Sequence, residues 1–518
     1  MTAARIVTEP LGGSALSLLL QRGEAPARWM APRPDSAKEW RARARQVARD
    51  CDGRWEVLLP AIEPTGLAAE RLARVMGGGG VVVTTGQQPG LFGGPLYTWS
   101  KAMSALALAD ALEAHLGIPT APLFWAATDD ADFAEAATTT VARVGGLDVL
   151  RAALTPSAGT PMALAMLGDL RDVERRLADA CGSAADARPL AAVAEHYGTP
   201  SHTHGAAFVG LLRTLLAPLG VAVLDASHTA VRTASEPTIR AALTNARALE
   251  SALAARAAEI RAGGYQPQVD DVPGLALAFV REGSTKRRLT VAEAARATGS
   301  LTPNVLLRPL VEQAILPTIA YVAGPGELAY FAQTSAAAAV LGLATPVAVP
   351  RWSGMVVEPH VQALLGTNGV ALEDLETVDA LESRLARARM SERYARVLAE
   401  LREAIAMIPD ALGDESEELG VGAAVVGATQ SIQHRVDRLE RRIVAAIKRR
   451  ETAQMHQVAT LRAALRPRGG RQERVLNAIP MLARSGCSLL DDLRTAARTH
   501  AEVLVERAQS TRTAGAER

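Results

Sequence analysis

The sequence predicts an α/β fold with a parallel β-sheet, followed by a long helical arm. Through the first three quarters of the chain, short apolar runs alternate with Ala- and Leu-rich stretches, a pattern typical of a parallel sheet covered by helices. After Thr367 the sequence becomes charged and poor in glycine, with leucine and isoleucine at helical spacing. The 518 residues suffice for about three domains, or for one large core with appendages.

The strands and helices of the core are expected in a regular order. Residues 80–84 (GVVVT) form a β-branched run, and an Ala/Leu-rich helix over 95–115 follows a glycine-rich turn. Residues 119–127 are the next predicted strand, ending in an acidic run, and 220–225 are another buried strand. Because ligands of open α/β sheets bind beyond the carboxyl ends of the strands, these strand ends are where we expect a site.

The other segments are predicted to be mainly helical. Charged stretches at about 145–195 and 234–300 are expected to be helix-rich insertions in a core of residues 1–375. Two long helices within 376–470 carry apolar seams that include Leu398, Leu401, Leu439 and Ile447, which indicates an antiparallel coiled-coil hairpin or a dimerisation arm. A helical tail over 471–518 completes the predicted organisation.

Composition argues against several classes of protein. Hydrophobic residues make up 48% of the chain, and 56 Lys and Arg balance 55 Asp and Glu, so neither disorder nor general polyanion binding fits. Residues 431–470 hold ten basic and three acidic residues, but no aromatic residue interleaves them to stack bases. We therefore favour a solvated helix face over an anionic partner there, and expect no nucleic-acid partner.

The sequence also indicates the cellular setting. Three widely spaced cysteines without a C-x-x-C motif argue against disulfides and a thiolate zinc site, and favour a reducing cytoplasm. The first 20 residues are too weakly apolar for a signal peptide. The uncharged residues 328–350 are long enough to span a bilayer, but their polar residues and two prolines favour a buried helix and a buried strand. We therefore expect no membrane association.

The first candidate site is the glycine-rich turn between the first strand and the helix after it. Its residues can present backbone amides to an anion, which predicts a phosphate or carboxylate cradle; the alternative is a turn that packing requires. The spacing matches neither of the familiar phosphate-binding glycine motifs. The candidate binding residues are Thr85, Gly86, Gln87, Gln88, Gly90, Gly93, Gly94 and Tyr97, with Lys101 one turn into the helix.

The second candidate is the acidic run after the second strand. Asp129, Asp130 and Asp132 could ligate a metal, orient a base, or bind an amine or a ribose hydroxyl. The alternative is an acidic cap of the helix that follows. The sequence does not decide between the ligand-binding and the helix-cap interpretations of these aspartates.

A third cluster follows farther along the chain. A GPGE turn again places amides and a carboxylate at one edge, and two arginines could clamp a carboxylate or phosphate, or could form structural salt bridges. Its candidates are Asn304, Arg308, Gly324, Gly326, Glu327, Tyr330 and Arg351. His202, in the pair with His204, is a candidate anion contact rather than a zinc ligand, so no protein-held metal is predicted.

Several long motifs closely resemble the bacillithiol-biosynthesis cysteine-adding enzyme family, the cysteine ligases. They occur in the family's order and run from about residue 80 to about residue 480. They are TGQQPGLFGGPLY from Thr85, PLFWAATDDADF over 122–133, NVLLRPLVEQAILPTIAYVAGPGELAYFAQ over 304–333, RLERRIVAAIKRR over 438–450, and LRPRGGRQERVLN over 465–477.

The resemblance implies a Rossmann-like core with connecting subdomains, a coiled-coil arm and a homodimer. It further implies the last step of bacillithiol assembly, in which the carboxyl group of cysteine is joined to the amine of glucosaminyl malate. The expected cosubstrate is ATP or another adenine nucleotide, with the need for magnesium left open.

The residue roles follow from this resemblance as hypotheses. The glycine loop and Lys101 would steady phosphate charge, and one of the three aspartates would bind or deprotonate the attacking ammonium. Arg308 and Arg351 would hold the malate carboxylates. The match departs at Ala131, where the family's acidic run carries a histidine. If that histidine is catalytic, the protein uses another base, for which His202 and His204 are candidates, or has a changed substrate. The alternatives are a non-catalytic nucleotide-binding scaffold and a glycosyltransferase.

Overall fold

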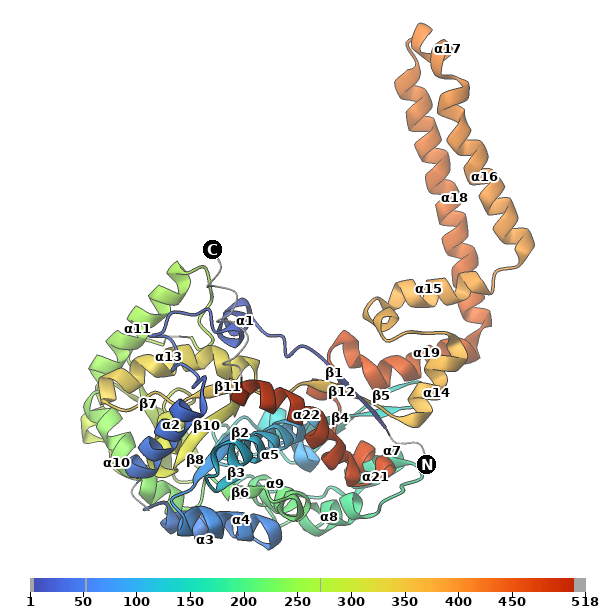
Figure 1. The fold of residues 1–518 in the computed structure, drawn as a ribbon. Coiled ribbons are helices and arrows are strands. Elements are labelled where there is room, and N and C mark those ends of the chain that lie inside the picture. The colour runs from blue at the N-terminus through green and yellow to red at the C-terminus, as the bar shows by residue number, and fades with distance from the viewer. Residues whose placement is uncertain (1–3, 52–53, 271, 507–518) are drawn as a thin grey trace. The chain divides into compact units, whose positions relative to one another are not determined.

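The computed structural model describes residues 4–51, 54–270 and 272–506 (Figure 1). The chain divides into two compact units. The core unit comprises the chain up to residue 141, residues 148–358 and the chain from residue 471 onward. The arm unit comprises residues 142–147 and 359–470. The last part of the sequence therefore returns to the core.

A five-stranded parallel sheet lies at the centre of the core unit, as the alternating pattern predicts. The strand order is β11-β10-β2-β3-β6, and all of the pairings are parallel. The residues of β3 and β10 are all buried, which explains their continuous apolar sequence. The strands are β2 (Val81–Gln87), β3 (Thr120–Ala126), β6 (Ala222–Asp225), β10 (Thr318–Ala323) and β11 (Ala348–Pro350).

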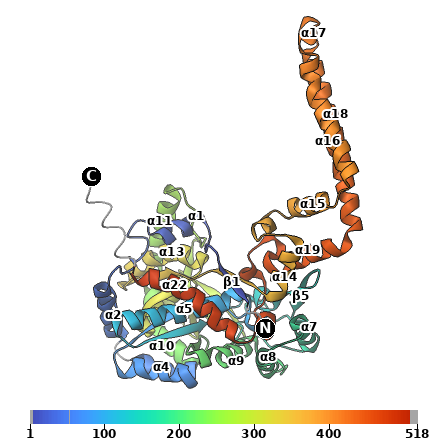
Figure 2. The same cartoon turned by 45° about the vertical axis from the view of Figure 1, so that its right-hand side comes forward.

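The longest core helices pack against the main sheet or against one another. Helix α5 (Leu96–Leu116) follows β2 and packs along α22 (Ser488–Glu506), and the two helices lie side by side in both views (Figures 1 and 2). Because α22 covers the face of α5 away from the sheet, α5 reads as apolar all round. Helix α13 (Pro325–Leu341) is followed by β11, so residues 328–350 are a buried helix and strand, as predicted. Among the described residues, we find no helix long and apolar enough to cross a membrane.

The prediction of a helix-rich segment over 234–300 is wrong for its second half. Helices α10 (Thr229–Thr244) and α11 (Ala246–Ala262) are followed by a three-stranded antiparallel sheet in the order β8-β7-β9. The prediction failed because charged residues dominate the segment as a whole, whereas the apolar run LALAFV of β7 is mostly buried. The strands are β7 (Leu275–Glu282), β8 (Thr285–Thr290) and β9 (Leu301–Pro303).

The remaining elements include two separate strand pairs and several helices outside the main sheet. Strand β1 (Arg5–Thr8) pairs antiparallel with β12 (Gly354–Val357). The segment 145–195 contains one strand as well as the predicted helices, because β5 (Gly146–Arg151) pairs with β4 (Thr138–Arg143). The other helices are α1 (Ala15–Arg22), α2 (Ala37–Cys51), α3 (Leu59–Ile62), α4 (Gly66–Gly77), α6 (Phe133–Ala136), α7 (Arg171–Cys181), α8 (Arg188–Tyr197), α9 (His204–Leu216), α12 (Arg308–Ile315), α20 (Gln472–Val475) and α21 (Ile479–Ser485).

The arm unit is built around a pair of long helices. Helices α16 and α18 run antiparallel, and Leu398, Ile405 and Val436 form one of their buried clusters, as the seam predicts. Leu401 and Leu439 were expected in that seam, but they are 40% and 48% exposed, because they lie off the contact face of the two helices. The arm helices are α14 (Pro359–Asn368), α15 (Val378–Ala388), α16 (Glu392–Ala411), α17 (Gly413–Glu418), α18 (Gly422–Arg450) and α19 (Thr452–Leu465).

Candidate functional site

A cavity of about 570 Å³ lies in the core unit, beyond the carboxyl ends of β2, β3 and β10. Its walls come from the loop after β2, the acidic turn after β3, the antiparallel sheet, the start of α13 and the short helix α20. This is the edge at which open α/β sheets bind ligands.

Most of the predicted site residues line this cavity. They are Gly86, Gln87, Gln88, Tyr97, Lys101, Asp129, Asp130, Asn304, Arg308, Gly324, Gly326, Glu327, Tyr330 and Arg351. The lining does not include Thr85, Gly90, Gly93, Gly94, Asp132 or His202. The structure thus brings together side chains from positions that lie more than 200 residues apart in the sequence.

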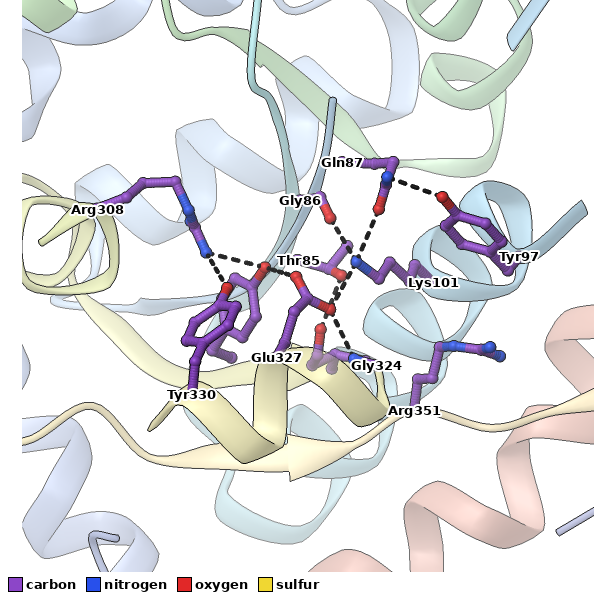
Figure 3. Close-up of polar contacts among 12 residues, drawn as sticks. Thr85, Gly86, Gln87, Tyr97, Lys101, Arg308, Gly324, Glu327, Tyr330 and Arg351 are labelled. Atoms are coloured by element: carbon purple, nitrogen blue, oxygen red, sulfur yellow. Dashed lines mark hydrogen bonds and ion pairs between the residues drawn. The ribbon is translucent and has the colours of Figure 1, made fainter. Parts of the chain in front are cut away.

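Lys101 is the centre of one side of the cavity. Its ammonium group lies 2.6 Å from Glu327 Oε2 and donates to the Gly86 carbonyl oxygen at 2.7 Å and to Gln87 Oε1 at 3.0 Å (Figure 3). Burial lowers the pKa of Lys101, and Glu327 opposes that shift. Lys101 therefore ties the loop after β2 to the start of α13.

Glu327 caps α13 and continues the same network. Its Oε2 accepts a hydrogen bond from the Gly324 amide at 2.6 Å, and its Oε1 accepts one from the Tyr321 hydroxyl at 2.5 Å. Burial acts to raise the pKa of Glu327, but Lys101 and these hydrogen bonds hold it below its usual value. The first amide of the GPGE turn is thus bound by the chain's own carboxylate.

Arg308 completes this hydrogen-bonded side. It forms an ion pair with the buried Glu312 at 2.5 Å. It also donates to the hydroxyls of Tyr321 and Tyr330, each at 3.2 Å (Figure 3). We call Lys101, Arg308 and Arg351, with their partners Glu327, Glu312 and Glu473, the ion-pair side of the cavity.

Arg351 is largely committed to a structural contact. Its two terminal nitrogens form a bidentate pair with Glu473 at 2.6 and 2.7 Å, and both side chains are almost fully buried. Its Nε is also buried and makes no hydrogen bond within the described chain. Of the two predicted readings of Arg351, the structural salt bridge is therefore present, and only Nε is left to contact a ligand.

The part of the glycine loop outside the cavity has a packing role. Gly93 and Gly94 have positive φ, and a Cβ at Gly90 would lie 2.7 Å from Gly94 Cα. Asn477 Nδ2 lies 3.1–3.2 Å from the carbonyl oxygens of residues 91, 92 and 94. Thr85 is buried and donates to the Val322 carbonyl oxygen, so its hydroxyl joins β2 to β10.

The acidic run divides between two roles. Asp132 caps α6, where its Oδ1 accepts from the Glu135 amide, so the helix-cap alternative holds for this residue. Asp129 and Asp130 line the cavity, and Asp130 Oδ1 accepts from the Ala131 amide. Burial raises the pKa of Asp129, Lys286 opposes the rise and Asp130 adds to it. Asp129 therefore has the environment of a group that exchanges a proton.

Three cations that line the cavity were not among the predicted site residues. Lys286 and Arg288 lie on β8, in the charged segment that was assigned to an insertion, and Arg474 lies on α20, in the predicted tail. Arg474 sits inside the QERVLN motif, which is the signal that could have revealed it. Six basic and three acidic side chains line the cavity in all, which favours an anionic ligand.

Neither histidine considered as a replacement at Ala131 lines the cavity. Ala131 does line it. His204 is buried, packs edge-on against Phe133 at 5.1 Å, and has its pKa lowered to about 4 by burial. His202 is exposed, and its Nδ1 contacts the His196 carbonyl oxygen. Among the described residues, no three His, Cys, Asp or Glu side chains cluster as metal ligands.

These features define a class: a Rossmann-like α/β protein with a charged ligand cavity at the carboxyl edge of its sheet and a coiled-coil arm. Two family models match the chain. "Bacillithiol biosynthesis BshC, N-terminal Rossmann-like domain" matches residues 65–298 and 284–352, and "Bacillithiol biosynthesis BshC, C-terminal coiled-coil domain" matches residues 354–503. The chain therefore belongs to the BshC family of bacillithiol biosynthesis, as its motifs predicted.

Curated relatives agree over most of the chain. A protein of Koribacter versatilis (strain Ellin345) is 33% identical over 467 residues, which are 84% of this chain and 86% of the relative. A protein of Solibacter usitatus (strain Ellin6076) is 30% identical over 456 residues, 83% of this chain and 85% of the relative. Both carry the name "Putative cysteine ligase BshC".

Proposed function

We propose that this protein is a cysteine ligase that joins the carboxyl group of cysteine to the amine of glucosaminyl malate, with ATP or another adenine nucleotide activating the carboxyl. The observation that carries the proposal is the pairing of a half-buried carboxyl group, Asp129, with a cavity whose lining holds twice as many basic as acidic side chains. A base and an anion-binding surface are what this reaction requires. The names of the relatives support the same activity.

The chemistry has two steps. First, a carboxylate oxygen of cysteine bonds to a phosphorus of the nucleotide, and the bond from that phosphorus to the next bridging oxygen breaks. This step produces a mixed anhydride and releases ADP or pyrophosphate, according to which phosphorus is attacked. The amine then attacks the carbonyl carbon, a C–N bond forms, and the bond from that carbon to the phosphate oxygen breaks. Because an ammonium group cannot attack, its proton must first be removed, and Asp129 is the base that we assign.

The cations would share the anionic groups of the substrates. Lys101 and the Gly86–Gln88 backbone would face phosphate charge, with magnesium as the counter-ion of the nucleotide rather than a metal held by the protein. Because Arg308 and Arg351 are engaged by Glu312 and Glu473, we assign them to the rigid frame of the malate site. Arg474, whose side chain is exposed at the cavity, would contact a malate carboxylate directly.

The test is a mass-spectrometric assay of the purified protein with ATP, magnesium, cysteine and glucosaminyl malate. Asp129→Asn should lower the rate of amide formation by about 10²–10⁴-fold, which is the range of general acid–base catalysis. The matched control is Asp132→Asn, which removes a carboxylate three residues away that caps α6 and does not line the cavity.

Other outcomes would change the proposal. Product formed from a sugar nucleotide instead of cysteine would indicate a glycosyltransferase. Nucleotide binding without any turnover would indicate a scaffold. An unaffected Asp129→Asn variant would leave the ligase activity in place and remove Asp129 as its base.

We also propose that the protein is a cytoplasmic homodimer that associates through the arm. The arm helices α16 and α18 leave Tyr394, Leu401 and Leu439 40–57% exposed, although these residues are apolar or aromatic. Such a surface favours a second copy of a coiled coil. Light scattering of the Leu401→Glu and Leu439→Glu variants should show a monomer where the wild type is a dimer. A monomeric wild-type protein would contradict this assignment.

A further inference from the structure

The hairpin β7–β8 brings a lysine to the acidic turn. Lys286 Nζ donates a hydrogen bond to the carbonyl oxygen of Asp129 and lies 4.7 Å from the centroid of the Phe279 ring. The side chain is half-buried and lines the cavity. Its ammonium group is thus held between an aromatic face and the main chain of the residue assigned as the base.

Main-chain hydrogen bonds fasten this arrangement. The Lys286 amide donates to the Gly159 carbonyl oxygen at 2.9 Å, so the hairpin is attached to the loop before α7. The same loop reaches the acidic turn. The Met162 amide donates to the main-chain carbonyl oxygen of Asp130 at 2.8 Å, and the Ala163 amide donates to that of Thr128 at 2.9 Å. Two segments that are distant in sequence, the hairpin and this loop, therefore hold the acidic turn.

Gly159 shows that the join is tight. It has a φ of +81°, and a Cβ placed there would lie 2.8 Å from the Lys286 carbonyl oxygen. A side chain at this position would strain the backbone and push β8 away from the loop. The location of Lys286 is consequently fixed by the fold and not by the flexible side chain alone.

The charges around Asp129 give the contact a chemical consequence. Lys286 faces it from β8, Arg308 faces it from α12, and Asp130 is its neighbour in the turn. Arg308 already pairs with Glu312, whereas the Lys286 ammonium contacts a neutral carbonyl oxygen. The positive charge of Lys286 therefore acts mainly on the Asp129 carboxyl group, and it opposes the effect of burial on the pKa of that group.

We propose that Lys286 is a positioning residue of the site, which fixes the acidic turn and supplies positive charge to the carboxyl group of Asp129, the assigned base. This inference rests on the proposed function, in which Asp129 is the base. It adds a residue on the antiparallel sheet to the catalytic arrangement, which otherwise comes from the edge of the parallel sheet.

The experiment compares three variants of the full chain. Lys286→Met removes the charge and retains much of the length, Lys286→Arg retains the charge, and Arg287→Met is the matched control. Arg287 is the next residue on β8, but it is exposed and pairs with Glu282 and Glu293. Carbon-13 NMR of protein labelled in its aspartate carboxyl groups follows the titration of Asp129, which is assigned by the signal missing from Asp129→Asn.

Lys286→Met should raise the pKa of Asp129, so that the carboxyl group is half-protonated at about tenfold lower proton concentration. Lys286→Arg and Arg287→Met should leave that pKa unchanged. In the amide-forming assay, the acidic limb of the kcat/KM profile should move to higher pH by the same factor. A purely structural lysine would change stability without moving either titration.

The two proposals fail in different ways. If the wild type forms no amide product, the proposed function fails, and the NMR titration still decides whether Lys286 controls Asp129. If product forms but Asp129 titrates identically in Lys286→Met and the wild type, the inference about Lys286 is overturned and the ligase proposal stands.

Discussion

The two sides of the cavity use charge differently. On the ion-pair side, each buried cation has a carboxylate within 2.7 Å: Lys101 has Glu327, Arg308 has Glu312 and Arg351 has Glu473. On the other side, which we call the acidic-turn side, charged groups contact the main chain instead. Lys286 donates to the Asp129 carbonyl oxygen, and Asp130 accepts from the Ala131 amide.

This difference indicates that the two sides of the cavity have different roles. A closed and buried ion pair cannot easily lose a proton or take up a new partner, because breaking it strands a charge at low dielectric. A charge that contacts only neutral groups remains available to a substrate. We infer that the ion-pair side mainly maintains the geometry of the cavity, with Lys101 also facing phosphate charge, and that the acidic-turn side and Arg474 perform the malate binding and the proton transfer.

The largest expected effect tests the ion-pair side. Arg351→Met leaves Glu473 buried without its cation and should reduce the free energy of unfolding by about 3–5 kcal/mol. Urea denaturation followed by circular dichroism measures this. The control is Arg171→Met, whose pair with Asp169 is exposed and whose loss should leave the transition unchanged. Equal stabilities of Arg351→Met and the wild type would contradict the structural role of the ion-pair side.

The next effect concerns the packing behind the acidic turn. Burial lowers the pKa of His204 to about 4, against an ordinary value of 6.5, so the unfolded chain binds a proton there before the folded chain does. Stability therefore falls as the pH decreases from about 6.5 to 4, and this residue accounts for about 3 kcal/mol of that loss.

His204→Leu should flatten this part of the pH dependence, measured by urea denaturation at several pH values. His202→Gln, a change at an exposed ring two residues away, should keep the wild-type dependence. Identical pH profiles for His204→Leu and the wild type would show that His204 is not the group responsible.

A smaller loss is expected at the contact that holds the glycine loop. Asn477→Ala leaves three loop carbonyl oxygens and the Thr139 hydroxyl without their amide donor, and should cost about 2 kcal/mol of unfolding free energy. Asn245→Ala removes a side-chain hydrogen bond at an exposed helix end and serves as the control. Hydrogen exchange of the loop amides should also accelerate in Asn477→Ala and not in Asn245→Ala.

The smallest effect on stability is expected at Arg474, which we assign to substrate binding. Arg474 is exposed at the cavity, so Arg474→Ala should change the free energy of unfolding by less than about 0.5 kcal/mol. In the amide-forming assay it should raise the KM for glucosaminyl malate about tenfold and leave kcat nearly unchanged, as the loss of one charge-assisted contact predicts. A stability loss as large as that of Arg351→Met would place Arg474 on the structural side.

Local patterns identified the central part of the fold. The runs at 80–84, 119–127 and 220–225 are strands of the parallel sheet, because buried parallel strands are apolar at every position and stand out from their flanks. The strands of residues 275–303 were missed, since three consecutive charged residues, the half-buried Lys286 and Arg288 and the exposed Arg287, dominate β8. Those charged positions carry the cations that face the cavity.

The sequence by itself determined the α/β class, the coiled-coil arm, the family and most of the cavity residues, because periodicity and long motifs are properties of short stretches of chain. Only the tertiary structure decided which charges pair. Glu473 lies more than 100 residues from Arg351, and Lys286 lies more than 150 residues from Asp129. Which of these groups is buried against which partner depends on the packing of distant segments, and burial and pairing are the terms that set the energy and the protonation of a charged side chain.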